Sequence, residues 1–284
     1  MNVLFPRSLK ECFAALEQPG ARILAGGTDL LVRLRARRKE AGEAGVLVSL
    51  DRLEALRGVS EAGGKGLHRV LRLGAASTHT ELLTHPLVRA RLPMLAAALE
   101  NLGSPPIRNM GTLGGNLCTA SPAGDCLPPL MALGAELELA SASGTRRLPL
   151  ADFVLGPGRT ALASGEVLAA VHVPLPEPGV LQHFEKVGRR NALAVAVVSL
   201  AALVRLGRGG KVASAQLAWG SVGPTVWRCP EAEAALAGRR LSLSALMDAA
   251  AVVRQRVQPI SDLRASADYR REVAGNLLLR LALL

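Results

Sequence analysis

Apolar residues recur along the chain in two patterns, alternation with polar residues and helical spacing, which predict strands and helices in mixed order. The alternation in ALGAELELAS (132–141) is typical of a half-buried strand. Ser8 followed by Glu11 predicts a capping box at the start of a helix over 8–17. The prolines and glycines of 104–116 predict a loop. We also expect strands at 21–24, 46–50, 70–78 and 167–175, and helices at 30–40, from near Thr78, and within 85–102.

A segment rich in proline, PLPEPGV (174–180), is interpreted as a domain boundary. Beyond it, the apolar run Ala192–Val204 is too short to span a bilayer and predicts a buried strand or helix. Strands and then helices make up the rest of this part, which favours an α+β fold. The expected elements are a strand at 212–222 and helices around 230–237, 242–257 and 266–282.

Composition narrows the classes of function. Apolar residues make up 49% of the 284, enough for a sizeable core, so a disordered chain is excluded. Aromatic residues make up only 2%, which argues against a protein that binds single-stranded nucleic acid by base stacking. The net charge of +11 is compatible with nucleic acid, a membrane surface or an acidic protein. The opening MNVLFPRSLKE has no apolar core of a signal peptide, so we expect a cytoplasmic protein without a membrane span.

Two clusters of glycine are candidates for an anion site, Ala25–Leu30 and Gly111–Asn116. Paired glycines let backbone N–H groups converge on a phosphate without a Cβ clash. The other interpretation is two tight turns that only require positive φ. No Gly-x-Gly-x-x-Gly and no Gly-x-x-x-x-Gly-Lys-Ser/Thr occurs, so the motifs of Rossmann and P-loop sites are absent. The residues alone predict no more than a candidate diphosphate site.

Five segments in fixed order resemble one family. AGGTDLLVRLR (25–35) and the run 104–139 are similar to the FAD-binding subunit of molybdenum hydroxylases, the relatives of xanthine dehydrogenase, carbon monoxide dehydrogenase and 4-hydroxybenzoyl-CoA reductase. FEKVGRR (184–190), WGSVGPT (219–225) and DLRASADYR (262–270) continue the resemblance. Because the match is nearly full length, the sequence is identified as a member of this family.

The resemblance implies an FAD-binding domain over 1–175, with α+β subdomains of about 1–55 and 56–175, and a C-terminal α+β domain over 180–284. It implies an electron-transfer subunit that takes electrons from the [2Fe-2S] clusters of a partner. A third subunit would carry the molybdopterin cofactor, and FAD would pass the electrons to NAD⁺ or another acceptor. No residue of this chain is expected to be catalytic, because the flavin carries the chemistry.

The resemblance also assigns FAD contacts. Asp125 matches an acid that binds the ribityl chain, and a helix cap is the alternative. Leu168 matches an apolar contact to the isoalloxazine, or is ordinary core. Lys186 matches a lysine near the flavin ring, or is a surface lysine. Leu102 stands where some relatives have a ring-packing phenylalanine. The diphosphate contacts are expected at Leu24, Ala25, Gly26, Gly27, Thr28, Asp29, Leu30, Thr112, Gly114, Gly115 and Asn116.

Two other functions stay open. The first is a stand-alone flavoprotein oxidoreductase of the same fold, which would need a substrate pocket of its own. The second is a basic binding module without catalysis, which would associate with nucleic acid in a salt-dependent way. Some relatives carry an extra cysteine-rich insertion for an iron–sulfur cluster. Here Cys118 and Cys126 make a pair and not a set of four ligands, so we expect no metal in this chain.

Overall fold

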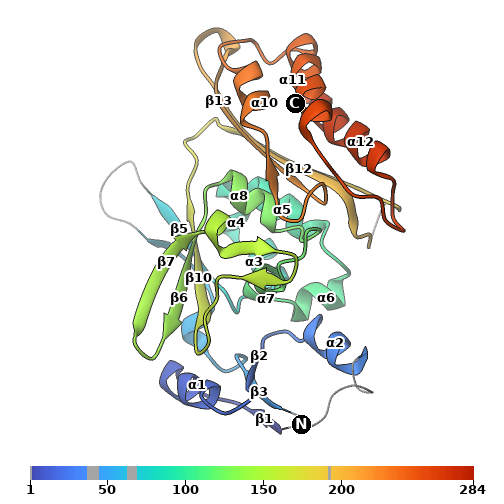
Figure 1. Ribbon diagram of the computed structural model, residues 1–284. Coiled ribbons are helices and arrows are strands. Elements are labelled where there is room, and N and C mark those ends of the chain that lie inside the picture. The colour runs from blue at the N-terminus through green and yellow to red at the C-terminus, as the bar shows by residue number, and fades with distance from the viewer. Residues whose placement is uncertain (1, 37–44, 63–68, 191–192) are drawn as a thin grey trace.

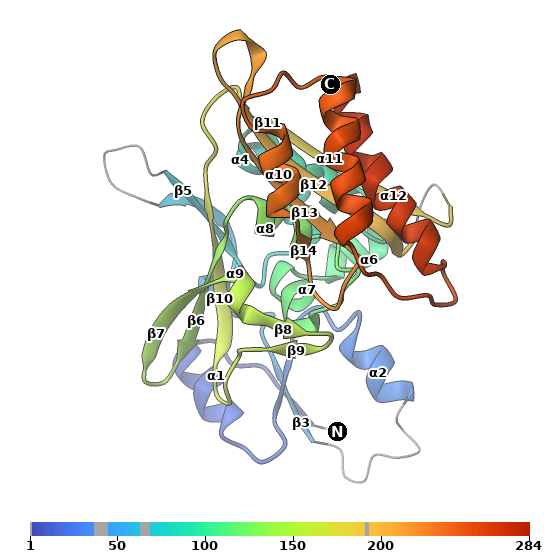
Figure 2. The ribbon, with the colours of Figure 1, turned by 45° about the horizontal axis from the view of Figure 1, so that its top comes forward.

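The structure is a computed structural model that describes residues 2–36, 45–62, 69–190 and 193–284. Three parts follow one another along the molecule: an N-terminal subdomain, a middle subdomain and a C-terminal domain (Figure 1). The same order is visible after a turn of 45° (Figure 2). Mixed strands and helices in all three parts confirm the α+β prediction.

The N-terminal subdomain is a small parallel sheet of order β1-β3-β2 with two helices. Cys12 and Val48 lie in its core with the apolar side chains of the sheet. The predicted cap of the first helix is confirmed, since the Ser8 hydroxyl accepts from the Glu11 amide. The helix predicted over 30–40 is described only to Ala36, and its remainder lies outside the described residues. The elements are β1 (Asn2–Leu4), α1 (Leu9–Leu16), β2 (Arg22–Leu24), α2 (Leu30–Ala36), β3 (Val46–Ser49) and the 3₁₀ turn Glu54–Leu56.

The middle subdomain is an antiparallel sheet of order β4-β5-β10-β6-β7, packed against a group of short helices. Its central strand β10 is buried along almost its whole length, since Leu168 and Val171 face one core and Val167 and Ala169 face the other. This explains the continuous apolar run of that strand. The strands are β4 (Val59–Ala62), β5 (Val70–Gly74), β6 (Glu136–Ser141), β7 (Gly144–Pro149), β8 (Val154–Gly156), β9 (Arg159–Thr160) and β10 (Val167–Pro174). The helices are α3 (His79–Thr84), α4 (Pro86–Arg91), α5 (Pro93–Glu100), α6 (Pro105–Met110), α7 (Leu113–Thr119), α8 (Leu127–Ala132) and α9 (Leu150–Phe153).

The loop predicted over 104–116 is wrong, because this stretch folds into α6 and the start of α7. Pro105 and Pro106 occupy the first turn of α6, where the absent proline N–H groups have no helical acceptor to lose. Gly111 ends α6, and the Thr112 hydroxyl caps α7 by accepting from the Gly115 amide. Pro and Gly therefore separate two short helices here.

The C-terminal domain is an antiparallel sheet of order β11-β12-β13-β14, with helices α10 to α12 packed on it (Figure 2). Residues 196–204 of the predicted apolar run form most of strand β12, buried between these helices and the middle subdomain, and Ala192 lies outside the described residues. The strands are β11 (Leu181–Gly188), β12 (Ala196–Leu206), β13 (Val212–Gly220) and β14 (Trp227–Arg228). The helices are α10 (Pro230–Leu236), α11 (Leu243–Arg256) and α12 (Ala267–Leu279), with 3₁₀ turns at Arg208–Gly210 and Arg280–Leu283.

The C-terminal domain is joined to the middle subdomain through a shared core. Helices α5 and α8 contact strands β11 to β13. Phe184, Ala201 and Ala218 from that sheet belong to the same buried cluster as the helices of the middle subdomain. Across the parts of the chain that the structure describes, no helix has the length and apolarity needed to cross a membrane.

Candidate functional site

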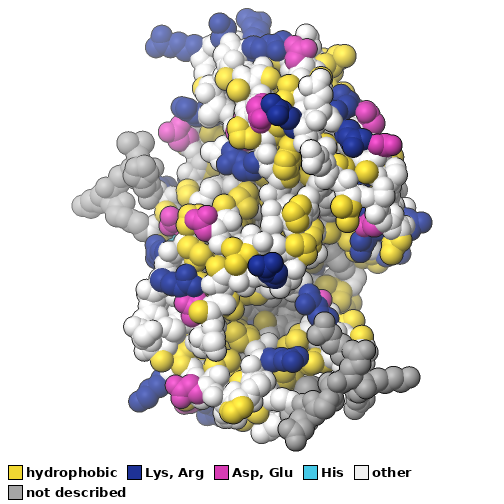
Figure 3. All heavy atoms as spheres, viewed as in Figure 1, with side chains coloured by type: hydrophobic (Ala, Val, Ile, Leu, Met, Phe, Trp, Pro, Cys, Tyr) yellow, Lys and Arg dark blue, Asp and Glu magenta, His cyan; other side chains and the backbone are white. Residues whose placement is uncertain are grey.

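A cavity of about 670 Å³ opens between the N-terminal and the middle subdomain. This volume lies within the range of small-molecule and cofactor sites. Figure 3 shows the molecule hollowed on this face, between its lowest part and its middle. Both glycine clusters of the sequence line the cavity, so segments that are far apart in the chain meet there.

The first glycine cluster presents unused backbone donors. The amides of residues 26–30 make no hydrogen bond with the described residues, and all five residues line the cavity. Gly27 has a φ of +71°, which turns the chain between β2 and α2. A Cβ on Gly26 would lie 1.7 Å from the Met110 carbonyl oxygen, so only glycine allows this approach. The cluster is therefore both a tight turn and a row of free N–H groups.

The amides of residues 113–116 in the second glycine cluster already donate hydrogen bonds to other residues of the protein. The Gly114 amide donates to the Ala75 oxygen at 2.7 Å, and the Asn116 amide donates to the Thr112 oxygen at 3.0 Å. A Cβ on Gly114 would lie 2.9 Å from that same Ala75 oxygen. Asn116 lines the cavity, and its buried Oδ1 has no hydrogen-bond partner among the described residues. This cluster thus supplies close packing and side-chain groups, whereas the first supplies free amides.

Both acidic side chains that line the cavity, Asp29 and Glu166, are already paired. Asp29 accepts from Arg33 at 2.7 Å and from the Thr119 hydroxyl at 3.1 Å. The second contact joins the N-terminal subdomain to α7 across the cavity. On the other side, Glu166 is paired with Arg146 at 2.6 Å, which lowers the pKa of Glu166. These pairs hold the walls of the cavity in place.

Leu102 and Leu168 form part of the apolar wall, since both line the cavity and are nearly buried, and their contact with the flavin ring stays a prediction. The sequence analysis missed the segment 162–166, which lines the cavity next to Leu168. Its only signal is Gly165, which has a φ of +76°. His79 also lines the cavity, and the sequence analysis did not select it.

Asp125 and Lys186 lie together, away from the lining of this cavity. The Lys186 Nζ is 2.8 Å from Asp125 Oδ2 and 2.5 Å from the Asn101 carbonyl oxygen. Burial raises the pKa of Asp125 to about 6, although Lys186 acts in the opposite direction. Lys186 instead lines a second cavity of about 280 Å³ with Arg108 and Arg190, where the C-terminal domain meets α5 and α6.

The structure therefore brings most of the predicted contacts into one cavity. Residues that line it are Ala25, Gly26, Gly27, Thr28, Asp29, Leu30, Leu102, Thr112, Gly114, Gly115, Asn116 and Leu168. Leu24 does not line it, and its carbonyl oxygen accepts from the Leu50 amide at 2.9 Å. Cys118 lines it as well, and burial raises the pKa of its thiol to about 12, so this sulfur stays protonated.

Two family models match the chain in succession. Residues 1–176 match the FAD binding domain in molybdopterin dehydrogenase. Residues 182–283 match the C-terminal domain of the carbon monoxide dehydrogenase flavoprotein. Together the two matches span both parts of the fold.

Several characterised proteins are similar along almost their full length. The xanthine dehydrogenase FAD-binding subunit of Escherichia coli O157:H7 is 35% identical over 257 residues, which cover 89% of this chain and 85% of that protein. The structure of carbon monoxide dehydrogenase from Hydrogenophaga pseudoflava superposes with a TM-score of 0.90 at 32% identity, covering 99% of this chain and 95% of that one. Quinoline 2-oxidoreductase from Pseudomonas putida 86 gives a TM-score of 0.91 at 31% identity, with 100% and 95% covered. The chain belongs to the family of FAD-binding subunits of molybdenum hydroxylases, and it is an oxidoreductase subunit whose cofactor is FAD.

Proposed function

We propose that this chain passes electrons from the [2Fe-2S] clusters of a partner subunit, through FAD in the cavity described above, to NAD⁺ or another acceptor. A third subunit with a molybdopterin cofactor would supply those electrons. The observation that carries the proposal is the row of free amides at residues 26–30, on the wall of a cavity of cofactor size. The similarity to FAD subunits of named dehydrogenases supports the same role.

The cavity fits FAD in three independent ways. A diphosphate is a multiple hydrogen-bond acceptor, and the amides of 26–30 are donors that lack an acceptor among the described residues. The buried Oδ1 of Asn116 has no partner in the described part of the chain, and the ribityl hydroxyls or the adenine amino group of FAD would provide a donor. The missing Cβ of Gly26 lets the first cluster approach Met110 and Gly111, so both clusters can line one site.

We propose distinct tasks for the walls. When bound, FAD supplies the ability to accept and release electrons and hydride. Leu102 and Leu168 would exclude water from the flavin ring, since their side chains offer no polar atom. Thr28 and Thr112 would add hydroxyl donors beside the diphosphate. The Asp29–Thr119 hydrogen bond would close the two subdomains on the cofactor.

Asp125 and Lys186 keep their predicted tasks as proposals. Asp125 does not line the cavity, whereas Ser121 of the same segment does; the buried Oδ1 of Asp125, without a partner among the described residues, would accept from a ribityl hydroxyl that reaches past Ser121. Lys186 is held by Asp125 and Asn101, and Asn101 precedes Leu102 of the cavity wall. A cation next to that wall would favour negative charge on the flavin ring.

The partners follow from what the relatives are. The similar structure from Hydrogenophaga pseudoflava is described as lacking the Mo-pyranopterin moiety of its molybdenum cofactor, which is a property of that enzyme complex. A medium chain of carbon monoxide dehydrogenase from the same organism is 31% identical to this chain over 277 residues. We infer that this chain likewise assembles with an iron–sulfur subunit and a molybdopterin subunit.

The test begins with an absorbance titration of the purified chain with FAD. The bound FAD is then reduced with dithionite, and the reduced protein is mixed rapidly with NAD⁺ or a quinone. We expect saturable binding and reoxidation by one of the two acceptors. Co-expression with an iron–sulfur subunit should then yield a stable complex that reduces the bound FAD. A chain that binds FAD and turns over a substrate of its own without partners would support a stand-alone flavoprotein instead.

A further inference from the structure

His79 lies where α3 begins, and hydrogen bonds hold this point against the segment that leads into the second glycine cluster. It is the first residue of α3, and its amide donates to the Gly111 oxygen at 2.9 Å. Thr78 forms a β-bridge with Thr112, and the Thr80 hydroxyl donates to Asn109 Oδ1 at 2.6 Å. Backbone and side-chain contacts on both sides therefore tie the start of α3 to the segment that leads into the second cluster.

The imidazole ring packs against Gly111, the first residue of the second glycine cluster. A Cβ on Gly111 would lie 3.1 Å from the ring Cδ2 and 3.3 Å from Nε2. The first cluster reaches the same place, since a Cβ on Gly26 would lie 3.0 Å from the Gly111 Cα. The ring and Gly26 therefore both approach Gly111, and the ring lines the same cavity as the free amides of the first cluster.

The ring has a polar group with no protein partner. His79 is 3% exposed, and its Nδ1 is buried without a hydrogen bond to the described residues. A buried N–H without an acceptor is more costly than a buried lone pair, which favours the tautomer with its proton on Nε2. Nε2 is then the nitrogen that remains for a ligand in the cavity, and it is a donor.

The charge state agrees with this assignment. Burial and the Arg108 guanidinium lower the pKa of His79 to about 4, so the ring is neutral near pH 7. A neutral imidazole offers one N–H and leaves no uncompensated charge in the wall. The anionic oxygens of a diphosphate accept strong hydrogen bonds from such a donor.

We propose that His79 donates a hydrogen bond from Nε2 to the diphosphate of FAD and completes the row of backbone donors at residues 26–30. The proposal rests on the proposed placement of FAD in this cavity. His79 would then contact the diphosphate of the cofactor and not its flavin ring.

The first test compares variants of two histidines. His79→Leu should weaken FAD binding at least about tenfold, because it leaves a charged acceptor without its donor. His79→Gln should restore much of the affinity, since its amide is again a donor. His85→Leu is the matched control: His85 caps α4 through Nδ1 and lies outside the cavity lining, so FAD affinity should not change.

The second test uses the wild-type chain and does not depend on whether the variants fold. In a sample labelled with ¹⁵N-histidine, ADP and FAD should shift the ring signals of His79, and riboflavin should not. A shift with riboflavin alone, or with none of the three, would overturn the proposal. A wild-type chain that binds neither FAD nor ADP would instead contradict the proposed function itself.

Discussion

The Lys186 ammonium lies 2.8 Å from the Asp125 carboxylate, and this contact joins strand β11 of the C-terminal domain to the segment before α8 in the middle subdomain. Both side chains are less than 10% exposed. Ion pairs in such surroundings lose much of their hydration, so each charge depends on the other. The pair is thus a buried link between the FAD-binding domain and the C-terminal domain.

Removing one member of this pair should destabilise the protein strongly. Lys186→Met leaves the Asp125 carboxylate buried without a cation, at a cost of about 3–5 kcal/mol in the free energy of unfolding. The double variant Asp125→Leu/Lys186→Met should recover most of that loss, because two apolar side chains replace the two charges. Urea unfolding of the wild type, the two single variants and the double variant measures both effects. A double variant as unstable as the sum of the single variants would contradict a coupled pair.

Asp125 should also make stability depend on pH with a definite sign. Its pKa is about 6 in the folded protein and has an ordinary value of 3.8, so the folded state binds the proton more tightly. Its contribution to stability is then full below pH 3.8 and is lost as the pH rises through 6. The advantage of the wild type over Asp125→Asn should fall by up to about 3 kcal/mol between pH 4 and 7. Unfolding of both proteins at several pH values tests this, and an advantage that grows with pH would reverse the assignment.

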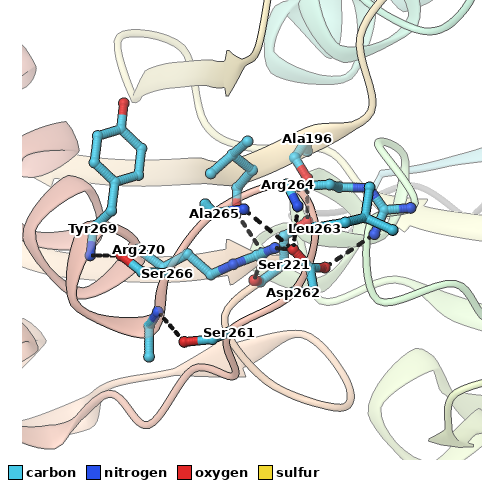
Figure 4. A network of polar contacts seen from close by, with 12 residues as sticks. Ala196, Ser221, Ser261, Asp262, Leu263, Arg264, Ala265, Ser266, Tyr269 and Arg270 are labelled. Atoms are coloured by element: carbon cyan, nitrogen blue, oxygen red, sulfur yellow. Dashed lines mark hydrogen bonds and ion pairs between the residues drawn. The ribbon is translucent and has the colours of Figure 1, made fainter.

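Arg270 is predicted to be the main polar support of the C-terminal domain. Its guanidinium donates to the Ser221 oxygen and to Asp262, each at 2.7 Å (Figure 4). It also donates to the Val197 oxygen at 2.8 Å. Ser221, held at a φ of +65°, in turn donates its amide to the oxygen of Pro122, which follows Ser121 of the cavity lining. Arg270→Met should cost about 1–3 kcal/mol for each buried carbonyl that loses its donor.

The matched control for Arg270 is Arg280→Met. Arg280 pairs with Glu185 at 3.0 Å, but its side chain is 54% exposed. An exposed pair of this kind contributes about 0–1 kcal/mol. The midpoint of thermal unfolding should therefore fall much more for Arg270→Met than for Arg280→Met. Equal losses of stability would show that the buried network around Arg270 contributes no more than an exposed ion pair.

Gly26→Ala should abolish retention of FAD. The new Cβ would lie 1.7 Å from the Met110 oxygen, and that atom is backbone, so the two glycine clusters must separate. Gly223→Ala is the control, because its Cβ would meet nothing closer than 3.5 Å. The ratio of flavin to protein absorbance after gel filtration measures the effect. Full FAD content in Gly26→Ala would contradict the role of this contact.

Local signals in the sequence predicted most of the fold. Ser8 and Thr78 cap the helices expected after them, and the run before Val204 forms a buried strand. The exception is 104–116, where Pro105 and Pro106 open a helix because they lie in its first turn. The same residue types that break a helix interior are favourable at its start, and local composition does not tell the two positions apart.

The site was predictable where it depends on the backbone. Paired glycines are a local signal, and the clusters at Gly26 and Gly114 both line the cavity, although the residues they approach, Met110 and Ala75, are distant in the chain. His79 and the segment 162–166 reach the cavity only through tertiary packing. The pairing of Asp125 with Lys186, 61 residues apart, likewise depends on the docking of two domains and has no local signal.

The two glycine clusters should differ in hydrogen exchange when FAD binds. The amides of 26–30 have no acceptor among the described residues, so they should exchange fast in the apo-protein. Bound FAD should slow them, because its diphosphate becomes their acceptor. The amides of 113–116 already donate to Ser77, Ala75 and Thr112, so they should be protected with or without FAD. Exchange measured by mass spectrometry on peptides covering each cluster gives an internal control within one molecule. Slowing at 113–116 with no change at 26–30 would reverse the assigned roles, because the diphosphate would then lie against the second cluster.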